Sequence, residues 1–341
     1  YQTGIFGKWH LGTGPGHCPT GFDDWAVLPG QGLYHNPHFI FKDDAAPGGR
    51  TEVVRGYVSD IIGDMTVDFI RNRDPEKPFC VMCHHKAPHR PWEPDEKHAG
   101  MYLEEDIPEP ETLYDTYENR SAAAADAKMR VGVDMGFPDL KTNINHDLPE
   151  MELRKWAYQR YIKDYLRVIA GVDDNVGKVL DELDAQGIAD DTIVIYTSDQ
   201  GFYLGEHGWF DKRFMYEESL RMPFVVRYPK GIEAGTVSTD FALNVDFAPT
   251  FLDYAGIEVP GEFQGRSLRP LFEQAIPGDW QTGMYYRYWM HDGHHCVRAH
   301  YGIRTHTHKL ICYYNDPMGM AGSRDEKFPM EWELFDLEKD P

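Results

Sequence analysis

The feature that most constrains the fold is a short apolar run whose end carries polar residues. Residues 192–196 read Thr-Ile-Val-Ile-Tyr, and such a β-branched run is typical of a strand buried on both faces of a parallel sheet. Asp199 and Gln200 follow shortly after it. Because ligands of open α/β sheets bind at the carboxyl ends of the strands, we expect a ligand site here. Two hard oxygen ligands, with Lys212 12 to 13 residues further on, indicate a divalent cation beside a bound anion.

Two further segments place basic side chains beside glycines or after a strand. Lys8 and His10 lie in residues 7–12, which read GKWHLG. Two residues apart, they share one face of an extended segment, and the flanking glycines let the backbone approach a ligand closely. His89 follows the apolar run 79–83, so a polar group again comes after a predicted strand. These basic groups are candidates for binding the anion.

Taken together, the three segments resemble the type I sulfatase family of the alkaline-phosphatase superfamily. Residues 7–12 resemble the family's second signature, residues 87–89 its central histidine, and residues 198–212 its metal-and-sulfate segment. The resemblance runs over nearly all 341 residues and is weakest around residues 118–148. It implies an α/β fold, an alkaline-phosphatase-like α/β/α sandwich with a mainly parallel sheet and a small antiparallel C-terminal subdomain.

The same resemblance implies a sulfuric ester hydrolase that uses one Ca²⁺ ion and a formylglycine nucleophile. Asp199 and Gln200 then complete the calcium site together with an Asp-Asp pair. Family members place Asn, Gln or His at the position of Gln200. The ion acts as a Lewis acid on a sulfate oxygen and holds the nucleophile.

Four further residues receive roles from the resemblance. Lys8 and Lys212 neutralise sulfate oxygens as negative charge builds during transfer. His89 binds sulfate or protonates the leaving alcohol. His10 helps to deprotonate the formylglycine hydroxyl and to expel sulfate. Residues that bind the rest of the substrate are not identified by the resemblance.

Two parts of the family pattern cannot be placed in this sequence. The family's Asp-Asp pair precedes the lysine signature, whereas Asp23-Asp24 and Asp43-Asp44 follow Lys8. The formylglycine arises from a Cys (or Ser)-x-Pro/Ala-x-Arg segment, but Cys18 has no arginine at the required place, and the other four cysteines do no better. We therefore expect a fragment truncated at both ends, which lacks the nucleophile and does not turn over on its own.

Composition agrees with a soluble globular enzyme. A formal net charge of −22 argues against a nucleic-acid partner, because phosphate binding needs a basic footprint. No apolar run approaches the roughly 18 residues of a membrane span. Five cysteines show no disulfide-rich spacing. Family members are usually exported, so we expect a secreted or periplasmic protein whose signal peptide lies in the missing N-terminal part.

Strand and helix patterns alternate along most of the chain, which predicts a mainly parallel sheet covered by helices. Helices are predicted at 51–73, 150–186 and 245–254, and strands at 79–83, 192–197 and 222–228. Four further segments look like antiparallel strands, at 284–289, 301–305, 309–314 and 332–337. We therefore divide the chain into a catalytic α/β domain, residues 1–282, and a truncated C-terminal subdomain, residues 283–341.

The substrate is predicted by resemblance alone. Residues 19–39, 300–305 and 332–337 are similar to bacterial sulfatases that act on N-acetylglucosamine 6-sulfate in mucin or glycosaminoglycan chains. A sulfated carbohydrate is therefore the expected partner. Two alternatives remain open: a phosphomonoester or phosphonate hydrolase of the same superfamily, and a non-catalytic protein that binds sulfated glycans.

Overall fold

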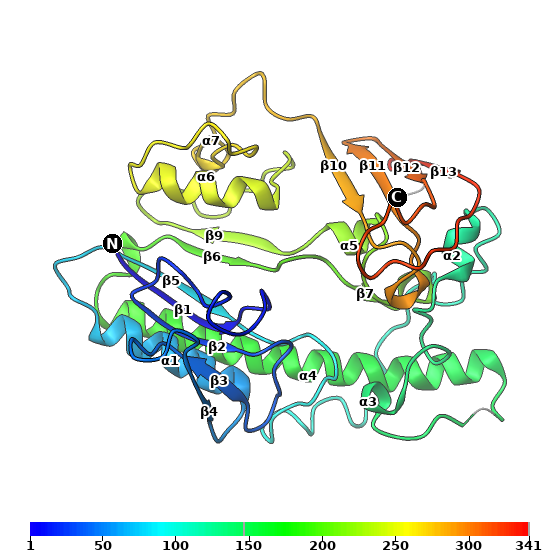
Figure 1. Cartoon of the computed structure of the whole chain (residues 1–341), viewed down its shortest axis with the longest axis horizontal. Coiled ribbons are helices and arrows are strands. Elements are labelled where there is room, and N and C mark those ends of the chain that lie inside the picture. Colours follow the sequence, from blue (N-terminus) through cyan, green and yellow to red (C-terminus); the bar gives the residue numbers. More distant parts are fainter. Residues whose placement is uncertain (146, 340–341) are drawn as a thin grey trace. The chain divides into compact units, whose positions relative to one another are not determined.

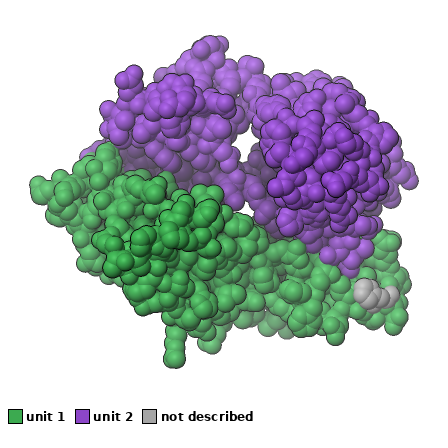
Figure 2. All heavy atoms as spheres, in the orientation of Figure 1, with its two compact units in different colours: residues 1–108, 135–192 green, residues 109–134, 193–341 purple. Residues whose placement is uncertain are grey.

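The computed structural model describes residues 1–145 and 147–339, and the chain forms two compact units (Figures 1 and 2). The first unit contains residues 1–108 and 135–192, and the second contains residues 109–134 and 193–341. No helix within the described residues is both long enough and apolar enough to cross a membrane. The predicted boundary at residue 283 falls inside the second unit and stays a prediction.

The first unit is built on a five-stranded mixed sheet with the order β4-β3-β2-β1-β5. Its strands are β1 (Gln2–Lys8), β2 (Asp24–Leu28), β3 (His38–Phe41), β4 (Arg50–Val53) and β5 (Phe79–His84). β1 pairs in parallel with both β2 and β5, whereas the β2–β3 and β3–β4 ladders are antiparallel. Because Gly7 of β1 lies opposite His84 of β5, these two neighbouring strands end at the same edge of the sheet.

Helices α1 (Val58–Asn72) and α4 (Glu150–Ala185) pack against each other, and α1 also contacts β1 and β5. The short helices α3 (Phe137–Leu140) and η1 (Ala189–Asp191) complete this unit. The predicted helix at 150–186 is confirmed, and it is followed by Gly187 at φ +67°. The predicted start at residue 51 is wrong, because residues 50–53 pair with β3 as an edge strand instead.

Both faces of β1 are packed, which fixes the strand that carries Lys8. On one face the ring of Phe6 lies 5.8 Å from that of Phe69 in α1. On the other face Ile5 is fully buried in a cluster with Trp25 and Val27 of β2. Strand β1 is therefore a rigid support for the residues that follow it.

The second unit begins with β6 (Val194–Thr197), which forms a two-stranded ladder with β9 (Phe224–Arg227). Both predicted strands are confirmed. Within this unit, however, the ladder is antiparallel and Tyr196 is 39% exposed. The predicted burial on both faces, between parallel neighbours, is therefore not seen in this unit. The remaining elements before the C-terminal sheet are α2 (Ala122–Asp126), β7 (Tyr203–Leu204), η2 (Glu206–Gly208), β8 (Phe210–Asp211), α5 (Glu217–Leu220), α6 (Asn244–Tyr254) and α7 (Arg269–Phe272).

The C-terminal part of the second unit is a four-stranded antiparallel sheet, as predicted. Its strands are β10 (Gly283–Tyr288), β11 (His300–Thr305), β12 (His308–Tyr313) and β13 (Glu331–Asp336), with the short helix η3 (His294–Cys296) between the first two. One core joins this sheet to the segment that carries Lys212. Its buried members include Tyr203, Trp209, Phe214, Met215, Tyr216, Val297, Ile311 and Tyr313.

Candidate functional site

Lys8 is the last residue of β1, at the edge where β5 also ends. Its backbone carbonyl lies 3.2 Å from Nδ1 of His84, the last residue of β5. Gly7 makes this close pairing possible, because a Cβ atom there would lie 2.0 Å from the His84 carbonyl oxygen and its φ is +111°. The cationic side chain of Lys8 is thus attached to a tightly fixed backbone.

We expect Gly7→Ala to destabilise the fold by about 2 to 3 kcal/mol, because it combines left-handed strain with a backbone clash. Chemical denaturation of the purified variant measures this change. Gly14→Ala is the matched control, since Gly14 also has a positive φ, +95°, but its Cβ would meet nothing within 4 Å. Equal losses in the two variants would show that strain alone, and not the approach of β5, requires glycine at position 7.

His10 lies beyond the end of β1 and adopts a left-handed backbone, with φ of +53°. The predicted extended segment that places Lys8 and His10 on one face is therefore wrong, since the strand stops at Lys8. The side-chain nitrogen of Gln31 lies 3.3 Å from Nε2 of His10. This contact fixes the imidazole from a loop that follows β2.

His89 lies in the loop after β5, and its backbone and ring are both hydrogen-bonded. Nδ1 lies 2.8 Å from the carbonyl oxygen of Arg90. Because a carbonyl can only accept, Nδ1 carries a proton in this contact, and proton exchange with a ligand would run through the other ring nitrogen, Nε2. The His89 carbonyl accepts a hydrogen bond of 2.6 Å from the Tyr34 hydroxyl. The ring is therefore held in one orientation.

Sequence reasoning missed Lys86, which also follows β5 and is only 2% exposed. Burial, together with the charge of Lys8, lowers the pKa of Lys86 to about 8, and Glu93 opposes the shift. Lys86 could have been found in the same way as His89, because it is also a polar residue just after a predicted strand. Its ammonium lies over the ring of Tyr34, which is 52 positions away in the sequence, so no local pattern could have predicted this contact.

Asp199 and Gln200 lie in the loop after β6. The amide of Asn244, the first residue of α6, donates a 2.9 Å hydrogen bond to the Asp199 carbonyl, and the Ser198 hydroxyl lies 3.3 Å from Oδ1 of Asp199. A carboxylate and an amide oxygen are ligands that suit Ca²⁺, but the ion takes six to eight oxygens. Within the described residues no group of three or more His, Cys, Asp or Glu could hold a metal. These two residues therefore fit part of a calcium site.

Lys212 follows β8 and lies between two residues with left-handed backbones, Asp211 at φ +77° and Arg213 at φ +98°. Its backbone N–H donates a 2.8 Å hydrogen bond to Oδ1 of Asp211. Its ammonium lies 5.8 Å from the centroid of the Phe202 ring. The two unusual backbone conformations fix the direction in which this side chain leaves the chain.

Beside Lys212 lies a charged cluster that sequence reasoning also missed. Asp211 is 4% exposed and forms ion pairs with Arg213 and with Nε2 of His295, the latter at 3.3 Å. Nδ1 of His295 lies 2.8 Å from the Lys128 carbonyl. Burial raises the pKa of Asp211. The hydrogen bond from His295 and the charges of Arg213 and Lys212 outweigh burial and hold this pKa well below its usual range. Asp211 and Arg213 flank the motif lysine, but nothing local in the sequence indicates His295.

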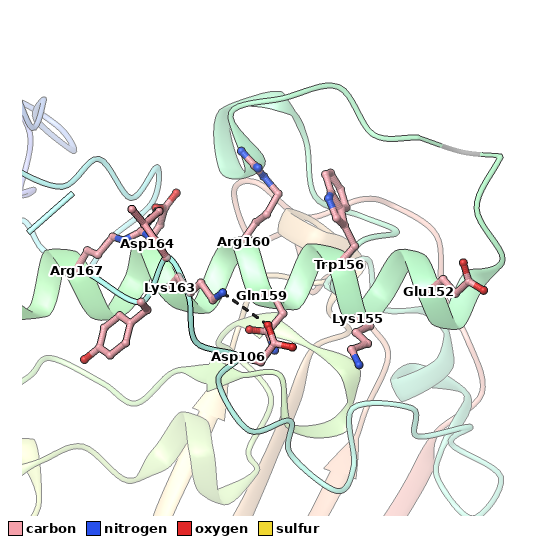
Figure 3. A pocket seen from close by; sticks show the side chains of 11 residues that line it. Asp106, Glu152, Lys155, Trp156, Gln159, Arg160, Lys163, Asp164 and Arg167 are labelled. Carbon is pink, nitrogen blue, oxygen red and sulfur yellow. Dashed lines mark hydrogen bonds and ion pairs between the residues drawn. The ribbon is translucent and has the colours of Figure 1, made fainter. Parts of the chain in front are cut away.

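A pocket of about 520 Å³ in the first unit contains none of the predicted site residues (Figure 3). Its lining comes mainly from α4 and includes both signs of charge. Figure 3 shows Lys163 directed toward Asp106, at 3.7 Å, and Arg167 pairs with Asp164 at 2.8 Å. Because several cations are already compensated, we do not assign the anion site to this pocket. The lining residues are Tyr102, Leu103, Asp106, Glu152, Lys155, Trp156, Gln159, Arg160, Lys163, Asp164 and Arg167.

Comparison with known families identifies the family to which these motifs belong. The family model described as "Sulfatase" matches residues 1–257, and the model described as "N-sulphoglucosamine sulphohydrolase, C-terminal" matches residues 205–341. The chain belongs to the sulfatase family. The family predicted from the three motifs is therefore confirmed, and the second match covers the antiparallel C-terminal sheet.

Two relatives of this sulfatase-family chain are named after an activity. The N-acetylglucosamine-6-O-sulfatase of Bacteroides thetaiotaomicron is 42% identical over the whole chain, and the arylsulfatase of Clostridium perfringens is 30% identical over 81% of it. The chain spans 65% of the length of the first relative and half of the second. The activity and substrate of a whole protein of this type are therefore matters for proposal.

A solved structure confirms the fold class of this sulfatase-family chain. It is described as a complex with its substrate D-glucosamine-2-N,6-O-disulfate, and it matches with a TM-score of 0.86 and 42% identity over 99% of this chain and 73% of that one. The predicted alkaline-phosphatase-like α/β fold with its antiparallel C-terminal sheet is thus borne out.

Proposed function

We propose that this chain is part of a sulfuric ester hydrolase that removes sulfate from a sulfated glycan, with the 6-sulfate of N-acetylglucosamine as its ester. The observation that carries the proposal is the 42% identity, over the whole chain, to a relative named N-acetylglucosamine-6-O-sulfatase. The solved neighbour described with a glucosamine disulfate supports the same substrate class. Export to the periplasm or the cell exterior, where such glycans occur, is part of the proposal.

Lys8 and Lys212 bind the sulfate group in this proposal. Each lysine is attached to a backbone fixed by its neighbours, which limits the region where its ammonium can meet developing negative charge. These local cations have to outweigh a formal net charge of −22, which otherwise repels an anionic glycan. Salt should therefore affect binding of the substrate more than turnover of the bound complex.

His89 and His10 move protons. With Nδ1–H bonded to a carbonyl, the imidazolium form of His89, protonated on both nitrogens, offers its Nε2 proton to the leaving alcohol oxygen and becomes the neutral Nδ1–H ring. His10, which contacts Gln31, would be the base for the hydroxyl of a nucleophile bound there. Asp211, Arg213 and His295 adjoin Lys212 and have the chemistry to bind sugar hydroxyls, since the carboxylate accepts and the guanidinium and imidazole donate.

The cofactors proposed for the whole enzyme are one Ca²⁺ ion and a formylglycine. Asp199 and Gln200 would supply two of the oxygen ligands, and the ion, when bound, supplies Lewis-acid polarisation of a sulfate oxygen. No cysteine of the 341 residues lies in a formylglycine segment. We therefore expect this chain alone to release no sulfate, and a form that carries the segment to do so.

The test is an assay of the formylglycine-bearing protein with N-acetylglucosamine 6-sulfate, an aryl sulfate and an aryl phosphate. Release of sulfate from the sugar supports the proposal. Preferential release of phosphate would move the assignment to a phosphoester hydrolase. Glycan binding without release of sulfate, unchanged by Asp199→Ala, would identify a binding protein instead.

We expect His89→Ala to lower turnover of the sugar sulfate by about 100-fold or more, but to affect an activated aryl sulfate much less. The reason is that a good leaving group needs little protonation. Steady-state kinetics of both substrates give the comparison. His38→Ala, an exposed histidine at the start of β3, is the control. Equal losses on the two esters would argue against an acid role for His89.

A further inference from the structure

Lys86 is a buried ammonium with no carboxylate partner among the residues that the structure describes. It is 2% exposed, and no carboxylate within the part of the chain that the structure describes forms an ion pair with it. Its nitrogen lies 4.3 Å from the centroid of the Tyr34 ring and 3.4 Å from the carbonyl oxygen of Arg90. Burying a charge in this way costs free energy of folding. Lys86 is thus not explained by a contribution to stability.

The contacts of Lys86 are with the groups that hold His89. The Arg90 carbonyl accepts from the Lys86 ammonium and is also the acceptor for Nδ1 of His89, at 2.8 Å. Tyr34, whose ring faces Lys86, donates its hydroxyl to the His89 carbonyl. The backbone N–H of His89 donates a 3.0 Å hydrogen bond to the carbonyl of Lys86 itself. Lys86 therefore contacts two groups that hydrogen-bond to His89, the Arg90 carbonyl and Tyr34.

We propose that Lys86 is a positioning residue for His89: it fixes the Arg90 carbonyl, so that His89 keeps a proton on Nδ1 and exchanges protons through Nε2. This inference rests on the role of His89 in the proposed function. An unconstrained neutral imidazole carries its proton on either nitrogen, and the partner of one nitrogen decides which. Lys86 acts on that choice through a shared acceptor and does not itself have to meet the substrate.

The charge of Lys86 makes this support sensitive to pH. Its pKa is lowered to about 8, first by burial and then by the charge of Lys8 at the end of β1, while Glu93 in the following loop opposes the shift. The Tyr34 ring and the Arg90 carbonyl also face it. Below pH 8 the ammonium is charged, and its 3.4 Å hydrogen bond to the carbonyl is stronger than the one that a neutral amine makes. As the pH rises through 8 it becomes neutral, and its hold on the carbonyl weakens.

The same shift gives the sign of the effect on stability. The lysine is protonated below pH 8 in both the folded and the unfolded chain, and its burial then destabilises the fold. Between pH 8 and its unfolded pKa of 10.5 the folded chain has lost the proton and the unfolded chain has not, so stability rises with pH. Lys86→Met, which keeps the length and removes the charge, is therefore expected to leave the melting temperature at pH 7 unchanged or raised.

The experiment is a long-range ¹H–¹⁵N spectrum of the protein labelled at its histidine nitrogens. The His89 signals are identified by their absence in His89→Gln. We expect wild type near pH 7.5 to show the Nδ1–H form and Lys86→Met to show a mixture with the Nε2–H form. In the formylglycine-bearing enzyme the same variant should lose about 10- to 100-fold in turnover of the sugar sulfate.

Lys309→Met is the matched control. Lys309 is also 2% exposed, but it belongs to the second unit and pairs with Glu217 at 3.2 Å. Its loss should lower the melting temperature and leave the His89 spectrum unchanged. Lys86→Arg, which keeps a charge and a donor, should restore the Nδ1–H form. A wild-type titration gives a second test that needs no variant, because the Nε2–H form should appear as the pH rises through 8.

Two results would overturn the proposal: an unchanged His89 spectrum in Lys86→Met, or a wild-type spectrum that does not respond between pH 7.5 and 9. A lowered melting temperature with an unchanged spectrum would identify Lys86 as a structural residue only. The spectrum is recorded without substrate. If it behaves as expected but the formylglycine-bearing enzyme releases no sulfate, the positioning role stands and the proposed function fails.

Discussion

Lys212→Ala is expected to lower turnover of a sugar sulfate by about 100- to 1,000-fold, the range typical for loss of one preorganised group that stabilises developing charge. The structure supports a large effect because the left-handed backbone on both sides of Lys212 fixes the direction in which its side chain leaves the chain and so limits the region that the ammonium can reach. Asp211 also accepts the Lys212 backbone N–H at 2.8 Å, a bond that the substitution keeps. Kinetics of the formylglycine-bearing enzyme provide the measurement.

The fold should survive this substitution. The side chain of Lys212 is half-buried, and its described ring contact with Phe202, at 5.8 Å, contributes at most about 1 kcal/mol. The pair of Asp211 with Arg213 and His295 remains in place. Lys327→Ala is the matched control, since it removes one positive charge from the same unit at an exposed ion pair with Asp316. Near-normal turnover of Lys212→Ala would remove this residue from the sulfate site.

The helices and strands were predictable where one local signal dominates. Residues 150–185 repeat apolar side chains at helical spacing, and the structure makes them one helix of 36 residues. The four C-terminal strands each lie within one or two residues of their prediction. The start of the helix at 51 failed because residues 50–53 gain hydrogen bonds to β3, a partner that helical spacing alone does not reveal.

The direction of strand pairing was less predictable, because it depends on which strands become neighbours. A β-branched apolar run at 192–197 fits a buried parallel strand, yet β6 pairs with β9 in the antiparallel sense within its unit. The run encodes extended backbone. It does not encode which strand becomes its partner or in which direction the two pair.

The candidate site also contains residues that the sequence could predict and residues that it could not. Lys8, His89 and Lys212 belong to short motifs with a glycine, a proline or a strand beside them, so a sequence can show them. Lys86 was overlooked although it lies in such a motif, because its meaning comes from Tyr34, far away in the chain. His295 contacts Asp211 across 84 residues, and only folding creates that pair. The groups that hold candidate site residues are thus harder to predict than the candidate residues themselves.

Asp199→Ala is expected to weaken Ca²⁺ binding to the formylglycine-bearing enzyme by at least about 100-fold, since removing a group that only orients a ligand already costs about 10- to 100-fold. A carboxylate contributes charge as well as an oxygen, and hard cations depend on both. Calorimetric titration with Ca²⁺ measures the affinity. Wild type should also gain thermal stability with added Ca²⁺ in proportion to the logarithm of its concentration, and the variant should not.

The control and the isosteric variant make the assignment specific to Asp199. Asp325→Ala removes an exposed carboxylate from the same unit and should leave the titration unchanged. Asp199→Asn keeps the size of the side chain and one oxygen, so its affinity should lie between those of wild type and alanine. Because Asn244 bonds to the backbone carbonyl of residue 199, none of these changes removes the loop's attachment to α6. Calcium that titrates into Asp199→Ala as it does into wild type would exclude Asp199 as a ligand and leave Gln200 without its partner in the proposed site.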